Sequence, residues 1–334
     1  MPKVSVLMPA YNAGKYIREA VDSILNQTYS DFELIIINDC SQDDTEAIIL
    51  DYSDPRVVYL KNEKNLGVAA TLNKGLDIAR GEYIARMDAD DIAFPERLKK
   101  QVERLDQDST LVVCGTQLCN FSDGVEAAGL QFPVNKAEAG ALLVLHPTVA
   151  HPTVMLRACV LRDNGLRYDL TYEGTEDFAL WWEISRYGTL GSLEDVLLKY
   201  RVHGGQVTQT VKPERVAVFK RFAAKRLRDM GINEDMASAL YEYTCDTYSA
   251  VTQQETQAFI TMLSEILQSE AARTRFDEYA LKKVLSRCAM RCIHMAAIPE
   301  WQRISMYQFA RKRNLLQLRT CIRNCCSRAV RCFR

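Results

Sequence analysis

The stretch Tyr83-Ile84-Ala85-Arg86-Met87-Asp88-Ala89-Asp90-Asp91 decides the fold of the first half of this chain. Residues 83–87 form a short, mostly apolar run, which predicts a buried β-strand. Three carboxylates within four residues follow this strand at once, and they repel one another unless a cation or strong hydrogen-bond donors compensate. The stretch therefore predicts a strand that ends in an acidic turn able to hold a cation.

Strands and helices alternate in the residues before this stretch. Strand-like runs are predicted at 4–8, 32–38 and 57–61. Helical spacing is predicted between them at 16–26, 45–52 and 68–79. Because such alternation is typical of βαβ units with right-handed crossovers, we predict an α/β fold with a doubly wound, mostly parallel sheet flanked by helices.

The remaining sequence changes character twice. Strand-like runs are predicted at 111–114, 153–156 and 196–202. They surround a helix that begins near Glu176, and we assign them to the same domain, which spans 1–212. The sequence then turns helical over 213–300, and residues 301–334 form a basic tail with apolar residues along one helical face.

Composition and charge exclude several classes of protein. With 48% hydrophobic residues among 334, the chain can bury an ordinary core and is not disordered. The formal net charge is -1, but residues 301–334 carry nine Lys or Arg and no acid, which leaves about -10 on the rest. Eleven cysteines without a CxxC pair indicate reduced thiols. Because no signal peptide and no run of roughly 20 apolar residues occurs, we expect a cytoplasmic protein.

Ligands of an open parallel sheet bind beyond the carboxyl ends of the strands. In this sequence those positions hold Pro9 and Tyr11, then Asp39, then the acidic turn. Carboxylate oxygens suit Mg²⁺ or Mn²⁺, which complete their coordination with substrate phosphate oxygens and water. The carboxylate of Asp39 can accept the imide N–H of a uracil while Tyr11 stacks on the base. The alternatives are a solvated acidic loop that caps the next helix and a plain turn at Asp39.

Several segments occur in an order that resembles one enzyme family. They are 4–12, 36–41, 65–67, 73–75, 79–84, 151–155, 175–181 and 200–203. Together with the acidic turn they resemble family 2 of the inverting glycosyltransferases, the GT-A type that uses nucleotide-diphospho-sugars. The resemblance covers roughly residues 3–205. It implies a catalytic domain over 1–212, with a nucleotide-sugar-binding half at 1–110 and an acceptor-side half at 111–212.

The resemblance also implies roles for individual residues. It makes Asp177 the catalytic base for the acceptor hydroxyl, with Glu176 and Trp181 as supporting residues. It assigns the cation to Asp90 and His203, with Asp91 as support. The donor-binding set that it implies is Pro9, Tyr11, Asp39, Asn65, Arg80, Asp88 and Ala89, of which Asp88 contacts the ribose or the sugar. The plainer alternatives are a helix cap at Glu176-Asp177, a core role for Trp181 and a structural role for His203.

The function that the resemblance implies is the inverting transfer of a single sugar. The donor is a nucleotide-diphospho-sugar, most simply a UDP-sugar, and the cofactor is Mn²⁺ or Mg²⁺. The acceptor is a hydroxyl of a saccharide or lipid-linked saccharide in surface polysaccharide or glycan biosynthesis. The Gln-x-x-Arg-Trp motif of the processive synthases is missing. The rivals are a non-catalytic carbohydrate-binding or scaffold protein of this fold and a nucleotidylyltransferase, which would need a Gly-rich loop after the first strand.

The basic tail at 301–334 has three interpretations. An amphipathic segment on an anionic membrane surface ranks first, and it would hold the protein at the inner face of the cell membrane. Intramolecular or partner packing ranks second, and nucleic acid is not expected. The tail cysteines Cys321, Cys325, Cys326 and Cys332 lack the paired spacing of a zinc site, so we expect them to pack as small apolar residues.

Overall fold

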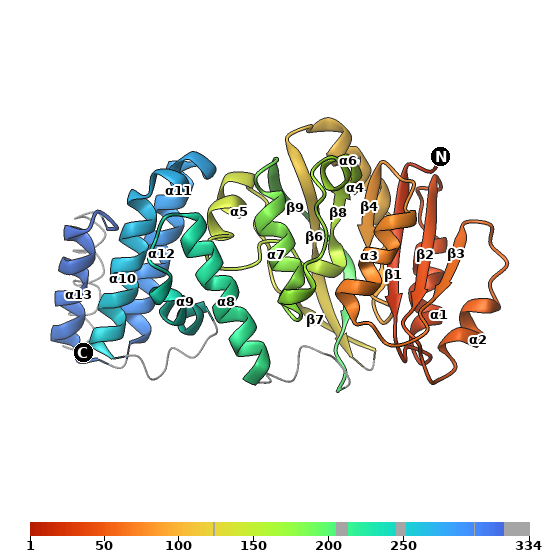
Figure 1. Cartoon of the computed structure of the whole chain (residues 1–334), viewed down its shortest axis with the longest axis horizontal. Coiled ribbons are helices and arrows are strands. Elements are labelled where there is room, and N and C mark those ends of the chain that lie inside the picture. Colours follow the sequence, from red (N-terminus) through yellow and green to blue (C-terminus); the bar gives the residue numbers. More distant parts are fainter. Residues whose placement is uncertain (123, 205–212, 245–251, 297, 317–334) are drawn as a thin grey trace. The chain divides into compact units, whose positions relative to one another are not determined.

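The computed structural model describes residues 1–122, 124–204, 213–244, 252–296 and 298–316. The chain forms two compact units (Figure 1). Unit 1 comprises Met1–Gly140 and Pro147–Lys212, and unit 2 comprises Ala141–His146 and Pro213–Arg334. Unit 1 carries the sheet and the predicted site, whereas unit 2 is helical in its described residues.

Unit 1 is built around one sheet of nine strands among the described residues, in the order β3-β2-β1-β4-β8-β6-β9-β5, with β7 paired to β6. The strands are β1 Val4–Ala10, β2 Phe32–Asn38, β3 Val57–Lys61, β4 Tyr83–Arg86, β5 Ile92–Ala93, β6 Leu111–Ser122, β7 Val125–Ala128, β8 Met155–Arg157 and β9 Thr189–Arg201. The helices of this unit are α1 Ile17–Leu25, α2 Thr45–Leu50, α3 Val68–Ile78, α4 Arg97–Gln107, α6 Ala158–Asp163 and α7 Glu176–Ile184, with short 3-10 turns at His151–Thr153 and Leu170–Tyr172. Helix α5, Lys136–Leu142, contributes residues to both units.

The first four strands are parallel, as the alternation of strands and helices predicts. β1 pairs with β2 and β4, and β2 pairs with β3. Their carboxyl ends therefore meet at one edge of the sheet. The second half is mixed, because β8 runs antiparallel to β4 and β6, while β6 and β9 are parallel to each other. The predicted α/β fold is confirmed, and antiparallel strands join the parallel half to the rest.

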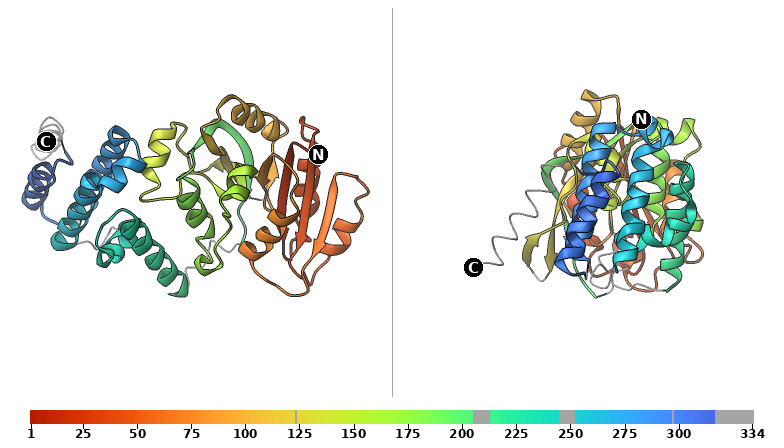
Figure 2. Two further views of the ribbon diagram at one scale, coloured as in Figure 1. Left: turned by 45° about the horizontal axis from the view of Figure 1, so that its top comes forward. Right: turned by 90° about the vertical axis from the view of Figure 1, so that its left-hand side faces the viewer.

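Alternating side chains of β1 and β2 pack against helices on opposite faces of the sheet. Val4, Val6 and Met8 share a core with the buried faces of α1 and α4. The intervening Leu7 faces α3, where a Cβ added to Gly75 would lie 3.1 Å from it. Strands buried on both faces are continuously apolar, which explains why β2 reads Leu34-Ile35-Ile36-Ile37. Figure 2 shows helices on both sides of this part of the sheet.

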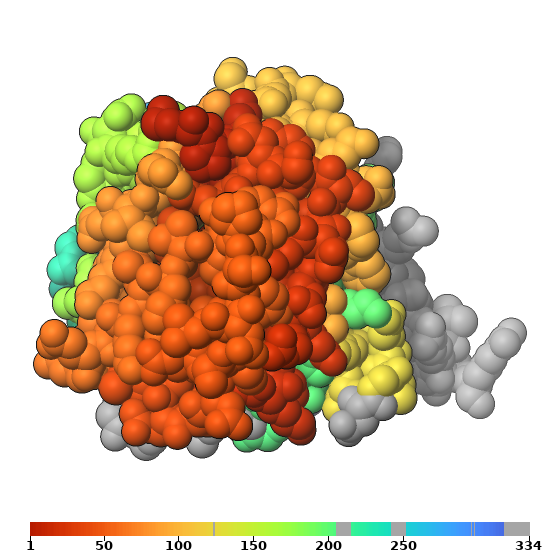
Figure 3. Space-filling model, turned by 90° about the vertical axis from the view of Figure 1, so that its right-hand side faces the viewer, coloured from red at the N-terminus to blue at the C-terminus, as the bar shows by residue number. Residues whose placement is uncertain are grey.

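The surface beside β3 belongs almost entirely to the beginning of the chain. In Figure 3 most of the face in view is red to orange, the colours of roughly the first hundred residues. This part of the molecule is therefore built from the consecutive βαβ units that the sequence predicts, without insertions from later segments.

The two long strands of the second half extend beyond their predicted bounds. β6 continues past residue 114 to Ser122, and β9 begins at Thr189 instead of 196. Polar residues interrupt the apolar pattern there, and Gln117 of β6 is one that is buried with partners. The amide of Gln117 donates to the carbonyl oxygens of Phe132 and Leu193 at 3.0 and 2.8 Å and accepts from the Phe132 amide at 2.8 Å. A satisfied buried amide is compatible with a strand, which a hydrophobic pattern does not reveal.

Unit 2 consists of helices in its described residues, as predicted. They are α8 Pro213–Asp229, α9 Ala237–Thr244, α10 Gln253–Gln268, α11 Glu270–Arg275, α12 Glu278–Met295 and α13 Glu300–Lys312, with a 3-10 turn at Glu234–Met236. Helix α10 starts with a capping box between Thr252 and Glu255. Within the described segments, no helix is both long enough and apolar enough to cross a membrane.

Helix α13 packs against α10 and α12, so the helical region does not end at residue 300. Met306, Tyr307 and Ala310 are buried, and the hydroxyl of Ser264 in α10 donates to the carbonyl oxygen of Arg313 at 3.0 Å. The predicted division between a helical region and a separate tail therefore does not hold for residues 301–316. The remainder of the predicted tail, 317–334 with its four cysteines, lies outside the described residues.

Candidate active site

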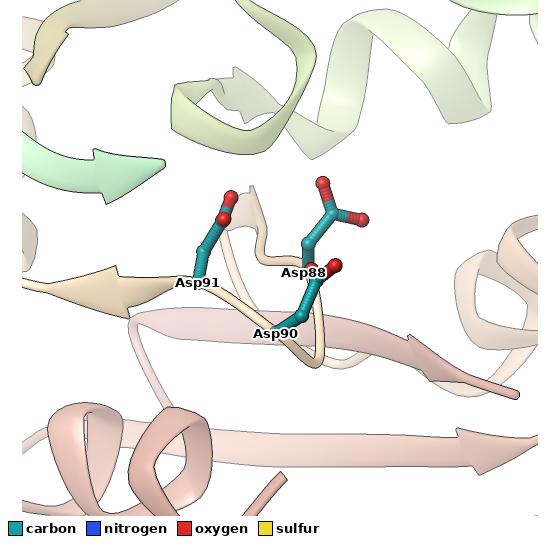
Figure 4. A group of neighbouring side chains, drawn as sticks. All are labelled: Asp88, Asp90 and Asp91. Atoms are coloured by element: carbon teal, nitrogen blue, oxygen red, sulfur yellow. The ribbon is translucent and has the colours of Figure 1, made fainter. Parts of the chain in front are cut away.

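An acidic turn joins β4 to β5 at the carboxyl edge of the parallel strands. It carries Asp88, Asp90 and Asp91, each of which offers an oxygen within 4.8 Å of the others (Figure 4). The three residues lie together because the turn is only a few residues long and both flanking strands are fixed in the sheet. Such a group of oxygens is the kind of site that Mg²⁺ or Mn²⁺ occupies.

Asp91 supplies the observation that most favours a cation. Its side chain is fully buried, and its Oδ1 accepts a hydrogen bond from the Arg201 amide at 2.9 Å. Its Oδ2 is buried without a hydrogen-bond partner among the described residues. Burial raises the pKa of Asp91 well above its usual range, and the neighbouring Asp88 and Asp90 raise it further. A divalent cation reverses this cost because it stabilises the ionised carboxylates.

Arg201, at the end of β9, holds the turn from the side. Its backbone amide donates the hydrogen bond to Asp91 described above. In addition, its Nε donates to the carbonyl oxygen of Asp90 at 2.7 Å. Its guanidinium pairs with Glu19 of α1 and lies 4.5 Å from the ring centroid of Tyr16 and 4.3 Å from that of Phe121. One side chain thus ties the acidic turn to α1 and β6.

His203 follows β9 by two residues and reaches the same turn. Its Nε2 lies 2.9 Å from Oδ2 of Asp90, and its ring lies 4.8 Å from that of Tyr16. The structure therefore brings together the two residues that we expect to bind the metal. Asp90 and His203 remain partly exposed, so a ligand can reach them.

Two buried arginines lie beneath the turn, and the sequence analysis does not identify either. Arg86 is the last residue of β4, is 5% exposed and forms an ion pair with Asp88. Arg97 is completely buried and donates to the carbonyl oxygen of Arg86 at 2.6 Å. Burial lowers the pKa of Arg97 to about 10, although Asp91 opposes this shift. The signal for Arg86 was a charged residue inside an otherwise apolar strand.

Asp39, directly after β2, organises the neighbouring loop. It is 4% exposed, and Oδ1 accepts from the side-chain amide of Asn62 and from the Leu66 amide, both at 2.8 Å. Oδ2 accepts from the Gly67 amide at 2.9 Å. Asn65, the other predicted donor contact in this loop, accepts from the same Gly67 amide at 3.1 Å. The structure thus joins Asp39 and Asn65 in one network.

The turns after β1 and β2 are linked to each other at the same edge. The amide of Asn12 donates to Ser41 Oγ at 3.0 Å, and the Asn12 side chain accepts from the Gln42 amide at 2.8 Å. Both turns contain a non-glycine residue with positive φ, Asn12 at 48° and Cys40 at 62°. Such residues cluster at functional sites. Tyr11, beside them, is half exposed and available to a base.

Pro9 and Ala89 occupy the same edge but are less accessible. Pro9 lies within β1 opposite Ile37 of β2. Ala89, within the acidic turn, is 6% exposed. A contact of either residue with a ligand would therefore involve mainly its backbone.

The predicted base lies at the start of α7. Glu176 and Asp177 occupy the first turn of this helix, and Oδ1 of Asp177 accepts from the Phe178 amide at 2.7 Å. Glu176 accepts from the Gly174 amide at 2.5 Å, and burial followed by the charge of Asp177 raises the pKa of Glu176. Asp177 thus satisfies one amide of the first helical turn, whereas the N-cap Thr175 makes no side-chain capping bond within the described residues, and this local bond does not conflict with a role toward an acceptor.

Aromatic and imidazole rings pack together near Arg86 and α7. Tyr168 is 4% exposed, and its hydroxyl lies 3.0 Å from Nε2 of His151. Burial raises the pKa of the Tyr168 hydroxyl, Arg86 opposes this shift, and the charges of Asp177, Glu176 and Asp88 add to it. Trp181 is fully buried with its ring 5.9 Å from that of His151, as the core interpretation requires. Sequence analysis does not single out Tyr168.

Arg80 does not lie at this edge of the sheet. Its Nε donates to Glu33 at 2.9 Å, and its amide donates to the other oxygen of that carboxylate, also at 2.9 Å. Glu33 is the second residue of β2, and Arg80 precedes β4, so both lie at the amino ends of strands whose carboxyl ends form the site. The predicted contact of Arg80 with the donor is therefore not supported by its position.

Known proteins similar to this chain belong to one class of enzyme. The model of the family described as glycosyl transferase family 2 matches residues 5–163. An uncharacterized glycosyltransferase of Haemophilus influenzae is 34% identical over 237 residues, which cover 68% of this chain and 73% of that protein. The putative glycosyltransferase EpsE of Bacillus subtilis is 37% identical over 206 residues, which cover 60% of this chain and 73% of EpsE.

Two solved structures share the fold. Residues 1–349 of TarS from S. aureus, in complex with UDP-GlcNAc, match with a TM-score of 0.60 and 19% identity over 94% of this chain and 88% of that one. The mannosyltransferase PcManGT from Pyrobaculum calidifontis, in complex with GDP-Man and Mn²⁺, matches with a TM-score of 0.53 and 19% identity over 94% and 86%. At this identity the likeness shows the fold alone, which is of the GT-A type.

Proposed function

Since this chain belongs to glycosyltransferase family 2, we propose that it transfers a single sugar from a nucleotide-diphospho-sugar to a hydroxyl of a saccharide or lipid-linked saccharide, with inversion at the anomeric carbon. The observation that carries the proposal is the acidic turn with a buried oxygen of Asp91 that has no hydrogen-bond partner in the described part of the chain. A buried acceptor without a partner is costly, and a functional ligand explains its presence. The setting that we assign to this chemistry is surface polysaccharide or glycan biosynthesis.

The donor-binding residues that we propose line the carboxyl edge of β1, β2 and β4. Three protein donors hold the Asp39 carboxylate in place, and its oxygens can also accept a base N–H. Tyr11 is exposed enough to stack on that base. We favour a UDP-sugar, and the UDP-GlcNAc complex of the structurally similar TarS supports this choice.

The residues of the turn fit a divalent cation, Mn²⁺ or Mg²⁺. We assign it to Asp90 with His203, and the unpartnered oxygen of Asp91 makes this residue a further candidate ligand. When bound, such an ion would stabilise negative charge on the departing nucleoside diphosphate. We assign Asp88, which forms an ion pair with Arg86, to the contact with the ribose or the sugar.

Asp177 is the residue that we propose as the general base. An inverting transfer needs one carboxylate on the acceptor side, which takes the hydroxyl proton as the oxygen attacks the anomeric carbon. Asp177 is partly exposed at a helix terminus, so its carboxylate can face an acceptor. Glu176 beside it is less suited, because burial favours its neutral form.

The test is transfer and hydrolysis of a panel of UDP- and GDP-sugars by the purified chain with MnCl₂ or EDTA. We expect release of nucleoside diphosphate only with metal. Asp90→Asn and Asp177→Asn should each reduce it roughly 100-fold or more. The exposed Asp163→Asn, at the end of α6, is the matched control. Unchanged turnover in both site variants would contradict the assignment of Asp90 and Asp177, and no turnover by the parent chain with any donor would favour a non-catalytic or scaffold protein of this fold.

A further inference from the structure

Charge is strongly segregated along the sequence of unit 2. Residues 230–278 contain nine Asp or Glu and two Arg, whereas residues 279–334 contain thirteen Lys or Arg and one acid, Glu300. With a net charge of -1, the first 278 residues therefore carry about -13. The basic segment thus begins near the start of α12, well before the tail that the sequence analysis separates at residue 301.

The described part of this segment exposes its charges on two packed helices. On α12, Lys282, Arg287 and Arg291 are exposed, and on α13, Arg311 and Lys312 are exposed. Glu300 pairs with Arg303 of its own helix at 3.3 Å.

Apolar side chains accompany the cations on the outer face of α13. Trp301 is 68% exposed and Ile304 is 42% exposed. Their spacing from Gln308 and Arg311 places all four on one helical face. The opposite face, with Met306 and Ala310, is buried in unit 2. Trp301 and Ile304 thus lie next to each other on the face that also carries Arg311.

We propose that the exposed faces of α12 and α13 form a docking surface for an anionic lipid bilayer. Cations near such a surface are attracted to its headgroups, and an exposed tryptophan is favoured at the boundary between headgroups and acyl chains. This differs from the predicted amphipathic tail, because the apolar face of α13 is occupied by the protein and only its outer face can meet lipid. The proposal does not depend on the transfer reaction.

A bilayer fits this surface better than a nucleic acid. Phosphates of a nucleic acid would satisfy the cations, but they offer no apolar layer for both Trp301 and Ile304. The acidic remainder of the chain is repelled by an anionic membrane, and it therefore favours contact through the basic surface alone.

The test is co-sedimentation of the full chain with vesicles of phosphatidylcholine, alone or with roughly one third phosphatidylglycerol. We expect binding only to the anionic vesicles and weaker binding at high salt. Arg311→Gln with Lys312→Gln should weaken it about 30-fold, since each cation contributes roughly a fivefold factor. Trp301→Ser should weaken it about tenfold through lost burial of the indole.

The control removes the same charge from unit 1 by replacing the exposed Lys64 and Lys99 with Gln. This variant should bind like the parent chain. Equal weakening in the control, unchanged binding in the Arg311 and Lys312 variant, or no binding of the parent would each overturn the proposal. Tight, salt-sensitive binding of a single- or double-stranded oligonucleotide with no binding of vesicles would also overturn it. All of these measurements are independent of donor turnover, so they test the docking surface even if the protein transfers no sugar.

Discussion

Replacing Asp91 by Asn should stabilise the metal-free protein and abolish its response to Mn²⁺. The side chain is fully buried, one oxygen is used by the Arg201 amide, and the other has no partner among the described residues. Burying an unsatisfied acceptor costs roughly 1 to 3 kcal/mol, and more if it is charged. An asparagine can keep the hydrogen bond from the Arg201 amide. Its side-chain amide can donate to the neighbouring carboxylates of Asp88 and Asp90, which the carboxylate of Asp91 repels.

The expected gain in EDTA is about 2 kcal/mol, which raises the unfolding temperature of a unit of this size by roughly 4 to 8 °C. In the parent chain, Mn²⁺ at one hundred times its dissociation constant should add about 2.7 kcal/mol, and this increment should vanish in the variant. Thermal unfolding in EDTA and in MnCl₂ measures both quantities. Asp163→Asn, an exposed site on α6, controls for loss of one negative charge.

Two outcomes would refute this reasoning separately. If the variant is destabilised in EDTA, the buried Oδ2 of Asp91 does not lower the free energy of unfolding of the parent chain. A variant that keeps the full stabilisation by Mn²⁺ would mean that Asp91 lies outside the cation site.

Three further predictions concern other parts of unit 1. Arg201→Met should raise the Mn²⁺ concentration needed for half-maximal turnover roughly 10- to 100-fold, because it removes the side chain that holds the acidic turn. The control is Arg18→Met, which removes an arginine of α1 that also forms an ion pair. It should leave this Mn²⁺ concentration unchanged in the same titration. Gly81→Ala should cost roughly 1 to 3 kcal/mol in urea unfolding, because the new Cβ would lie 2.5 Å from the Ser5 nitrogen, whereas Gly204→Ala has open space and should cost little. The bond from Lys136 holds the pKa of Asp108 well below its usual range, so its folded pKa is depressed and its stabilisation is present above the unfolded pKa. Asp108→Asn should therefore lower the free energy of unfolding near pH 7, and the difference should shrink as the pH falls below about 4, where a constant difference would contradict the assignment.

The sequence predicts those parts of unit 1 where local pattern and position agree. β2 and β3 have the predicted bounds, and the acidic turn, Asp39 and Tyr11 lie at one edge because carboxyl ends of parallel strands must meet there. His203 reaches Asp90 although more than one hundred residues separate them. That proximity follows from the resemblance to the family and not from the spacing.

The errors have physical reasons of a different kind. Arg80 is close to Asp88 in sequence, but the two residues flank opposite ends of β4. Asp88 follows the carboxyl end of this strand, at the site, whereas Arg80 precedes its amino end. Arg97 and Tyr168 are buried polar residues that contact Arg86 and His151 in other segments, and no local pattern reveals these contacts. Arg86 does stand out locally, as a charge inside an apolar strand. The packing of α13 was missed because its apolar face is equally suited to a lipid surface and to neighbouring helices.

The hydrogen bonds between the turns after β1 and β2 have a consequence for kinetics. Asn12 and its partners fix both turns in the absence of any ligand. A donor that binds there does not have to order this part of the chain, so its association should be limited by encounter rather than by loop closure. Breaking the link, as with Asn12→Ala, should then slow association and leave dissociation comparatively unaffected, a difference that stopped-flow fluorescence with a nucleotide analogue can resolve.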